Sequence, residues 1–129
     1  MKSNTEDNSS SAAVLKNALV WHEQWKETLR GTVDSGAAVD AAIIRRDDCC
    51  ELGKWIYSDG QRLYWGRPEF QELLLNHREF HMLAGAVAEV LNEKKYELAA
   101  AYLSSDTQFV HASNQVRESI RRLESVVDQ

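Results

Sequence analysis

The segment from Pro68 to Lys94 constrains the fold more than any other part of the chain, because its apolar residues recur at steps of three and four. This spacing places one face of a helix against a core. A proline at the start suits the first turn of a helix, where a backbone N–H would have no partner. The predicted buried face consists of Phe70, Leu73, Leu74, His77, His81, Ala84, Ala88 and Leu91. We therefore expect one long amphipathic helix over residues 68–94, with two histidines directed toward the core.

The rest of the chain also favours helices. Only one proline and six glycines interrupt 129 residues, and the sequence shows no strand-like alternation. The expected helices cover residues 11–30 with Gly31 as the stop, 36–47, 48–60 with Asp48 and Glu51 as a capping box and Gly60 as the stop, and 97–127. The buried face of the last helix would carry Leu98, Tyr102, Phe109, Val116, Ile120, Leu123 and Val127. We predict an all-α fold, an antiparallel four-helix bundle with additional short helical segments.

Length and charge narrow the classes of function. A chain of 129 residues fits one domain, and we expect a disordered N-terminal tail at residues 1–10 and one helical domain over residues 11–129. The net charge of −5, with both signs interspersed, argues against a nucleic-acid-binding surface. Apolar runs stay far below the roughly 18 residues of a membrane span, and the polar N-terminus lacks the apolar core of a signal peptide. We therefore expect a cytoplasmic protein without nucleic-acid or membrane partners.

Three histidines lie on predicted buried faces. His77 and His81 are four residues apart, so both project from the same side of one helix and can reach one metal ion. His22 lies between Leu19 and Trp25 on the apolar face of the first helix. A single inward histidine is more often a hydrogen-bonded core residue than a ligand. Three inward histidines from two helices need many ring-nitrogen partners, and a shared metal ion would satisfy one nitrogen of each.

Cys50 can supply a fourth ligand. At a helix start, backbone amides favour its thiolate and lower the thiol pKa. Three imidazoles and one thiolate form a tetrahedral donor set that zinc prefers. A Cys49–Cys50 disulfide is not expected, because adjacent Cα atoms are about 3.8 Å apart and disulfides need roughly 4.4–6.8 Å. Cys49 is interpreted as a packing residue, with a role as resolving cysteine left open.

Three short motifs resemble those of the chemoreceptor zinc-binding (CZB) domain family. Cys50–Trp55 matches its CxLGxW pattern, His22 and Trp25 match HxxW, and His77–His81 matches HxxFH, in the order of the family. The resemblance implies a four-helix-bundle zinc sensor with a 3His/1Cys site made by His22, Cys50, His77 and His81. Such domains are bacterial and cytoplasmic, are usually fused to chemoreceptors or diguanylate cyclases, and are often dimers.

Four residues are expected to surround these ligands. Trp25 and Phe80 belong to the motifs themselves. Gly53 would permit close approach of the helices at the site, and Trp55 would cover it.

The leading hypothesis for function is a regulatory module that signals zinc occupancy. We expect a homodimer, as in the family. No output domain is attached in this sequence, which suggests either action in trans on a diguanylate cyclase or a chemoreceptor, or an excised fragment. Binding should weaken as pH falls through the histidine range near 6.5. The alternative is a redox sensor in which hypochlorous acid attacks the zinc-bound Cys50 thiolate. A zinc hydrolase ranks last, because four protein ligands leave no open position for water.

Overall fold

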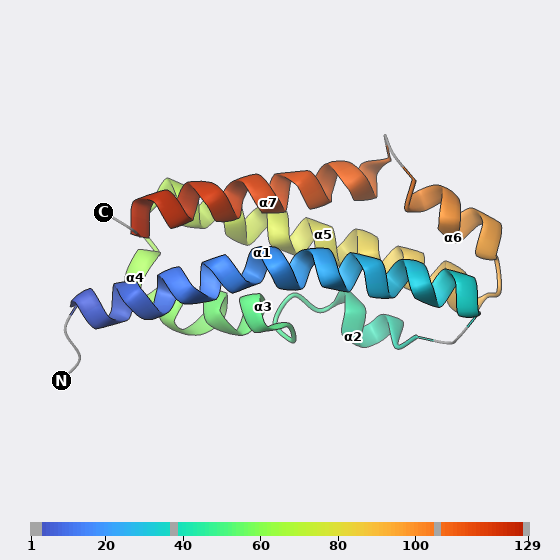
Figure 1. Cartoon of the computed structure of the whole chain (residues 1–129), viewed down its shortest axis with the longest axis horizontal. Coiled ribbons are helices and arrows are strands. Elements are labelled where there is room, and N and C mark those ends of the chain that lie inside the picture. Colours follow the sequence, from blue (N-terminus) through green and yellow to red (C-terminus); the bar gives the residue numbers. More distant parts are fainter. Residues whose placement is uncertain (1–3, 37–38, 105–106, 128–129) are drawn as a thin grey trace.

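Helices make up almost the whole structure (Figure 1). The computed structural model describes residues 4–36, 39–104 and 107–127. Its elements are α1 (Asn4–Ser35), α2 (Ala41–Arg45), α3 (Glu51–Trp55), the π-helical turn η1 (Ile56–Gly60), α4 (Gln61–Tyr64), α5 (Pro68–Asn92), α6 (Tyr96–Tyr102) and α7 (Gln108–Val127). The all-α prediction is confirmed for these ranges, which contain no strand. None of the helices described is long and apolar enough to cross a membrane.

Three long helices lie alongside one another. α7 packs against both α1 and α5, and α2 packs against α5. The consecutive elements α3, η1 and α4 form a shorter run that contacts α1. Along the sequence, α1, this short run, α5 and α7 alternate in direction in Figure 1. The arrangement is therefore compatible with the expected antiparallel four-helix bundle, with the short run in the place of one helix.

The core lies between the long helices and includes buried polar groups. Its fully buried apolar side chains include Leu15, Ile56, Phe70, Leu73, Val116 and Ile120. Trp55 Nε1 donates a hydrogen bond to Ser11 Oγ at 3.2 Å, which links α3 to α1. Asn76 Nδ2 donates to Ser119 Oγ at 2.7 Å, which links α5 to α7. Buried polar groups that find partners in this way add little cost to the apolar core.

The short helix α2 is attached to the far end of α5. The Asn92 side chain accepts from the N–H of Val39 at 2.9 Å and donates to the carbonyl of Val39 at 2.7 Å. The two helices touch closely at Gly85, where an added Cβ would lie 2.8 Å from Cβ of Arg45. A helix of five residues is too short to be stable alone, so these contacts with α5 hold it in place.

α1 is longer than the sequence predicts at both ends. It continues through Gly31, the expected stop, because Leu29 and Val33 extend the apolar face that packs on the core. Gly36 ends it instead. Its φ of +72° is left-handed, and its N–H donates to the Thr32 carbonyl at 2.9 Å.

α1 begins at Asn4, so residues 4–10 are helical where the sequence predicts a disordered tail. Residues 1–3 lie outside the described part of the chain. The division of the sequence into a tail and a domain stays a prediction.

The region between α1 and α5 differs most from the prediction. The helix expected over residues 36–47 is limited to α2, because Arg46 has extended backbone angles (φ −76°, ψ 130°). The capping box of Asp48 and Glu51 is not formed, since Asp48 pairs with Arg46 and Cys50 caps α3. Gly60 does not end the helical run, which continues into α4.

Gly60 is instead needed for close packing inside the run. Its own backbone angles are helical (φ −60°, ψ −50°). A Cβ at this position would lie 2.9 Å from the Trp55 carbonyl oxygen and 3.0 Å from the ring of Phe70.

The last predicted helix is two helices, α6 and α7. Thr107 starts the second, because its Oγ1 accepts a hydrogen bond from the N–H of Val110 at 3.3 Å. Leu98 and Tyr102, expected on the buried face, are 41% and 42% exposed on α6. The predicted face holds along α7, where Phe109, Val116, Ile120, Leu123 and Val127 are buried.

Candidate metal centre

α5 positions two of the predicted ligands. His77 and His81 lie one turn apart on its core face and are only 2% and 7% exposed. Their Nε2 atoms are 3.1 Å apart. The helix therefore brings two imidazole nitrogens to one buried point, as the four-residue spacing predicts.

The turn before α3 brings a thiol to the same point. Cys50 is the N-cap of α3, and its Sγ accepts a hydrogen bond from the N–H of Gly53 at 3.2 Å. The same sulfur lies 3.2 Å from His77 Nε2 and 3.6 Å from His81 Nε2. In the part of the chain that the structure describes, these three residues form the one group whose donor atoms all lie within 4.8 Å of one another.

The spacing of the three donor atoms fits a tetrahedral metal ion. Zinc holds nitrogen at about 2.0–2.1 Å and sulfur at about 2.3 Å, so tetrahedral ligands place two nitrogens about 3.3 Å apart and nitrogen about 3.6 Å from sulfur. The observed separations are 3.1 Å between the nitrogens and 3.2 and 3.6 Å from nitrogen to sulfur. The donors are thus nearly in place for a shared ion.

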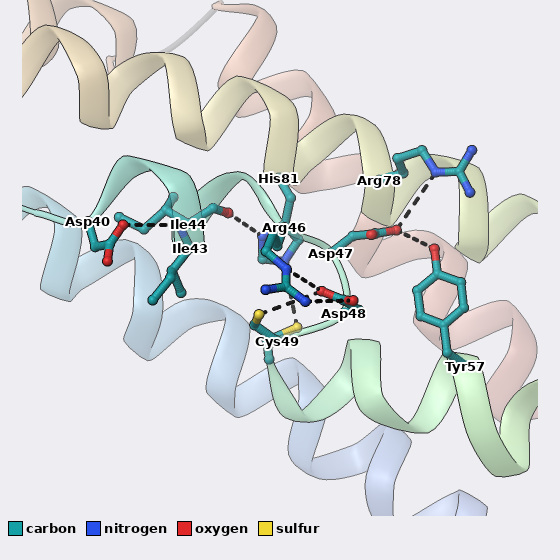
Figure 2. A network of polar contacts seen from close by, with 11 residues as sticks. Asp40, Ile43, Ile44, Arg46, Asp47, Asp48, Cys49, Tyr57, Arg78 and His81 are labelled. Atoms are coloured by element: carbon teal, nitrogen blue, oxygen red, sulfur yellow. Dashed lines mark hydrogen bonds and ion pairs between the residues drawn. The ribbon is translucent and has the colours of Figure 1, made fainter.

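A backbone carbonyl fixes the protonation of His81. Its Nδ1 lies 2.8 Å from the carbonyl oxygen of Ile44, at the end of α2 (Figure 2). A carbonyl can only accept, so Nδ1 carries the ring proton and Nε2 of the neutral ring presents its lone pair to His77 and Cys50. Metal-binding histidines are commonly oriented by a hydrogen bond of this kind on the other ring nitrogen.

The three donors are electrically neutral in the metal-free protein. Burial, and then the neighbouring His81 ring, lowers the pKa of His77 to about 3. Burial also lowers the pKa of His81. Neutral imidazole is the form that binds metal. Nδ1 of His77 is buried and has no hydrogen-bond partner among the described residues.

The Cys50 thiol departs from its predicted behaviour. The helix start was expected to lower its pKa, yet burial raises it, and this effect outweighs the opposing amide of Gly53. A coordinated metal ion removes the thiol proton outright, so the raised pKa describes the metal-free protein only.

His22 lies beside these three residues without joining them. It is buried on α1 and lines, with the other three, a cavity of about 110 Å³. Its Nε2 is 2.8 Å from Ser113 Oγ on α7, and its nitrogens do not lie within 4.8 Å of all three other donor atoms. Burial, and then the nearby Lys26 ammonium, lowers its pKa to about 4. Its assignment as a ligand stays a prediction.

The residues expected around the ligands have different positions. Phe80 is buried, with its ring 4.6 Å from that of His22, and Trp25 lies 5.5 Å from Phe80 and 6.2 Å from His81. Both line the cavity. The described residues that line it do not include Trp55, whose ring instead lies 6.3 Å from Phe70 in the core.

Gly53 permits a close approach, but of the turn before α3 and not of another helix. A Cβ on Gly53 would lie 1.9 Å from the carbonyl oxygen of Asp47. Only a glycine therefore allows this turn to fold back onto α3.

Two partners of the site were missed by sequence reasoning. The Ile44 carbonyl could not have been found, because any residue type provides one. Ser113 lies on the buried face of α7, four residues after Phe109 and three before Val116, and this spacing was the available signal. His111 lies on α7 and is exposed.

Comparison with known proteins agrees with the geometry. Residues 22–88 match the chemoreceptor zinc-binding domain (CZB), a range that is just over half of the chain and contains all four predicted ligands. No curated protein and no solved structure gives a significant match. The pattern of buried histidines and cysteine, the helical fold and the matched range lead to one conclusion: the chain belongs to the chemoreceptor zinc-binding domain family.

Proposed function

We propose that the protein is a cytoplasmic regulatory domain that binds one Zn²⁺ ion and signals its occupancy to a partner protein. The observation that carries this proposal is the meeting of Cys50 Sγ with the Nε2 atoms of His77 and His81 at 3.1–3.6 Å in a buried cavity. A mixed nitrogen and sulfur donor set in tetrahedral spacing favours zinc over magnesium, calcium or manganese, which prefer oxygen ligands.

His22 completes the donor set in this proposal. It lines the same cavity as the other three residues and is neutral. Because its nitrogens do not lie within 4.8 Å of all the other donors, the side chain has to shift for coordination. Its present contact with Ser113 is what a buried imidazole needs in the absence of an ion.

The site contacts several elements that could transmit its state. Cys50 belongs to the turn before α3, His81 is bonded to the end of α2, and His22 is bonded to α7. In the proposal, a change at the ligands is passed to these three elements. In the proposal, a homodimer passes this change to a diguanylate cyclase or a chemoreceptor in trans. A bound zinc ion would supply positive charge and fixed ligand geometry, which suits a sensor, and four protein ligands leave no open position for a hydrolase.

A redox role is the second candidate, because Cys50 is half-buried while the three histidines are buried. Hypochlorous acid would transfer its chlorine to the thiolate sulfur with release of hydroxide, and water would then displace chloride and lose a proton to give a sulfenic acid. The sulfenic acid would no longer serve as a thiolate ligand. Release of zinc by stoichiometric hypochlorous acid, abolished in Cys50→Ser, would support this role.

Elemental analysis of the purified protein tests the metal site. We expect about one zinc per chain in the wild type, and loss or strong weakening in Cys50→Ala. Cys49→Ala is the matched control, because Cys49 is the adjacent half-buried thiol and contacts Asp48 at 3.5 Å. It should retain zinc.

A second pair of variants tests the fourth ligand. His22→Ala should weaken zinc binding, whereas the exposed His111→Ala should not. A wild-type protein that holds no zinc even after reconstitution would refute the proposed function. Equal zinc affinity in His22→Ala and wild type would refute only the role of His22.

A further inference from the structure

The turn that carries Cys50 has little regular structure of its own. Residues 46–50, called the Cys50 turn here, connect α2 to α3 through irregular backbone. A helix holds its side chains by repeated backbone hydrogen bonds, whereas a turn of this kind depends on contacts with its surroundings. The position of the Cys50 sulfur therefore depends on what attaches the turn to the rest of the molecule.

Asp47 provides the attachment. Its Oδ2 accepts a hydrogen bond from the Tyr57 hydroxyl at 2.5 Å and lies 3.8 Å from Arg78 Nε (Figure 2). Tyr57 belongs to η1 and Arg78 to α5. One carboxylate thus joins the turn to two elements at once, and one of them is the helix that carries the two histidines of the site.

The backbone of Asp47 is fixed as well. Its carbonyl oxygen lies against Gly53, so close that a Cβ there would be 1.9 Å away. Asp47 is three residues before Cys50, and Arg78 directly follows His77. The side-chain contacts of Asp47 therefore act between the two parts of the chain that supply the metal donors.

The neighbouring ion pair, in contrast to Asp47, joins residues of the same turn. Arg46 donates two hydrogen bonds to Asp48, at 3.0 and 3.1 Å, and Asp48 also contacts Cys49 (Figure 2). All three residues belong to the Cys50 turn. Among the described residues, no side chain of this pair contacts another element, so the pair provides a matched control.

We propose that Asp47, held by Tyr57 and Arg78, is a positioning residue that keeps the Cys50 thiol beside His77 and His81 and so sets how long bound metal is retained. The proposal rests on the proposed zinc site. Loss of one typical hydrogen bond changes a rate or equilibrium constant by about three- to tenfold.

The first experiment measures zinc release from the loaded protein into an excess of chelator. Tyr57→Phe removes only the hydroxyl of a half-exposed ring, and we expect release about three- to tenfold faster than in the wild type. Asp47→Ala should show the same direction, and Asp47→Asn, which keeps an acceptor for Tyr57, should recover part of the effect. Arg46→Ala should stay within about twofold of the wild type.

A double variant tests whether the two residues act together. Because Tyr57 and Asp47 share one hydrogen bond, Tyr57→Phe with Asp47→Ala should release zinc no faster than Asp47→Ala alone. Additive effects of the two substitutions would overturn the proposal.

The second experiment needs no metal. In a Cys49→Ala background, the rate of labelling of Cys50 by a thiol reagent reports how firmly the turn is held in the metal-free protein. We expect faster labelling in Tyr57→Phe and unchanged labelling in Arg46→Ala, with helical circular dichroism unchanged in both. Labelling rates equal to the parent in Tyr57→Phe, or raised equally by Arg46→Ala, would overturn the positioning role. A wild type without zinc would instead refute the proposed function, and the labelling result would still decide the role of Asp47.

Discussion

The two halves of the candidate metal site are built in different ways. His77 and His81 project from α5, a regular helix of 25 residues whose inner face is buried in the core. Cys50 comes from an irregular turn that is followed by a five-residue helix and a π-helical turn. The geometry of the first half is set by the helix itself, while that of the second is set by contacts with its surroundings. We therefore expect α5 to keep its form without metal and the Cys50 turn to respond to metal.

The largest expected effect comes from Gly53→Ala. The added Cβ would lie 1.9 Å from the Asp47 carbonyl oxygen and 2.8 Å from its carbon, so the Cys50 turn has to move off α3. Backbone atoms cannot yield as a flexible side chain can, and we expect a loss of about 3 kcal/mol in the free energy of unfolding. Zinc binding should be lost while most helical circular dichroism remains. Full zinc content with an unchanged melting temperature would show that the position of the Cys50 turn does not depend on its contact with Gly53.

Removal of the metal should destabilise the protein slightly less, and only in the half of the site that contains Cys50. At free zinc 100 times the dissociation constant, binding stabilises the folded form by about 2.7 kcal/mol. We expect hydrogen exchange in residues 46–55 to become up to about a hundredfold faster on chelation. Amides around Ala84 in α5, which is fully buried, should stay protected. Complete loss of helical circular dichroism on chelation would show that the two halves do not differ.

Ser113→Ala tests the contact that holds His22 in the metal-free protein. The substitution leaves Nε2 of a buried imidazole without its partner at 2.8 Å. We expect the free energy of unfolding of the metal-free protein to fall by about 1 to 3 kcal/mol, measured by urea unfolding. Ser125→Ala, on the exposed side of α7, is the control and should change stability by less than about 0.5 kcal/mol. Equal stability of the two variants would mean that His22 gains nothing from Ser113.

The smallest effect is expected from Gly31→Ala, and it is stabilising. Gly31 lies inside α1, and a Cβ there would meet no described atom within 4 Å. Alanine favours a helix interior over glycine by about 0.5–1 kcal/mol, so the melting temperature should rise. The same substitution therefore has opposite signs at Gly31 and Gly53. A fall in melting temperature would mean that α1 ends at Gly31 after all.

The regular half of the site is also the half that the sequence predicts well. The spacing of His77 and His81 within an apolar face defines both their helix and their common direction, and α5 ends within two residues of its predicted boundary at Lys94. The motif that begins at Cys50 indicated the third donor. These features are local, because helical periodicity alone determines which residues share a face.

The irregular half could not be predicted in the same way. Asp48 and Cys50 both have side chains that can cap a helix, and in the structure Cys50 caps α3 while Asp48 pairs with Arg46. Gly60 has the sequence signature of a stop but serves close packing against Trp55. Such choices are decided by contacts between segments, which a single sequence does not display.

The hydrogen bond from His81 to Ile44 has one more consequence. Ile44 belongs to α2, which Asn92 attaches to the end of α5. With α2 in place, Nε2 of His81 has a free lone pair. With α2 detached, the ring could place its proton on either nitrogen, and the tautomer with the proton on Nε2 has no lone pair there for a metal ion. The packing of the five-residue helix α2 therefore keeps the His81 ring in the tautomer that can bind a metal ion. A force that pulls α2 away would weaken metal binding without contacting any ligand.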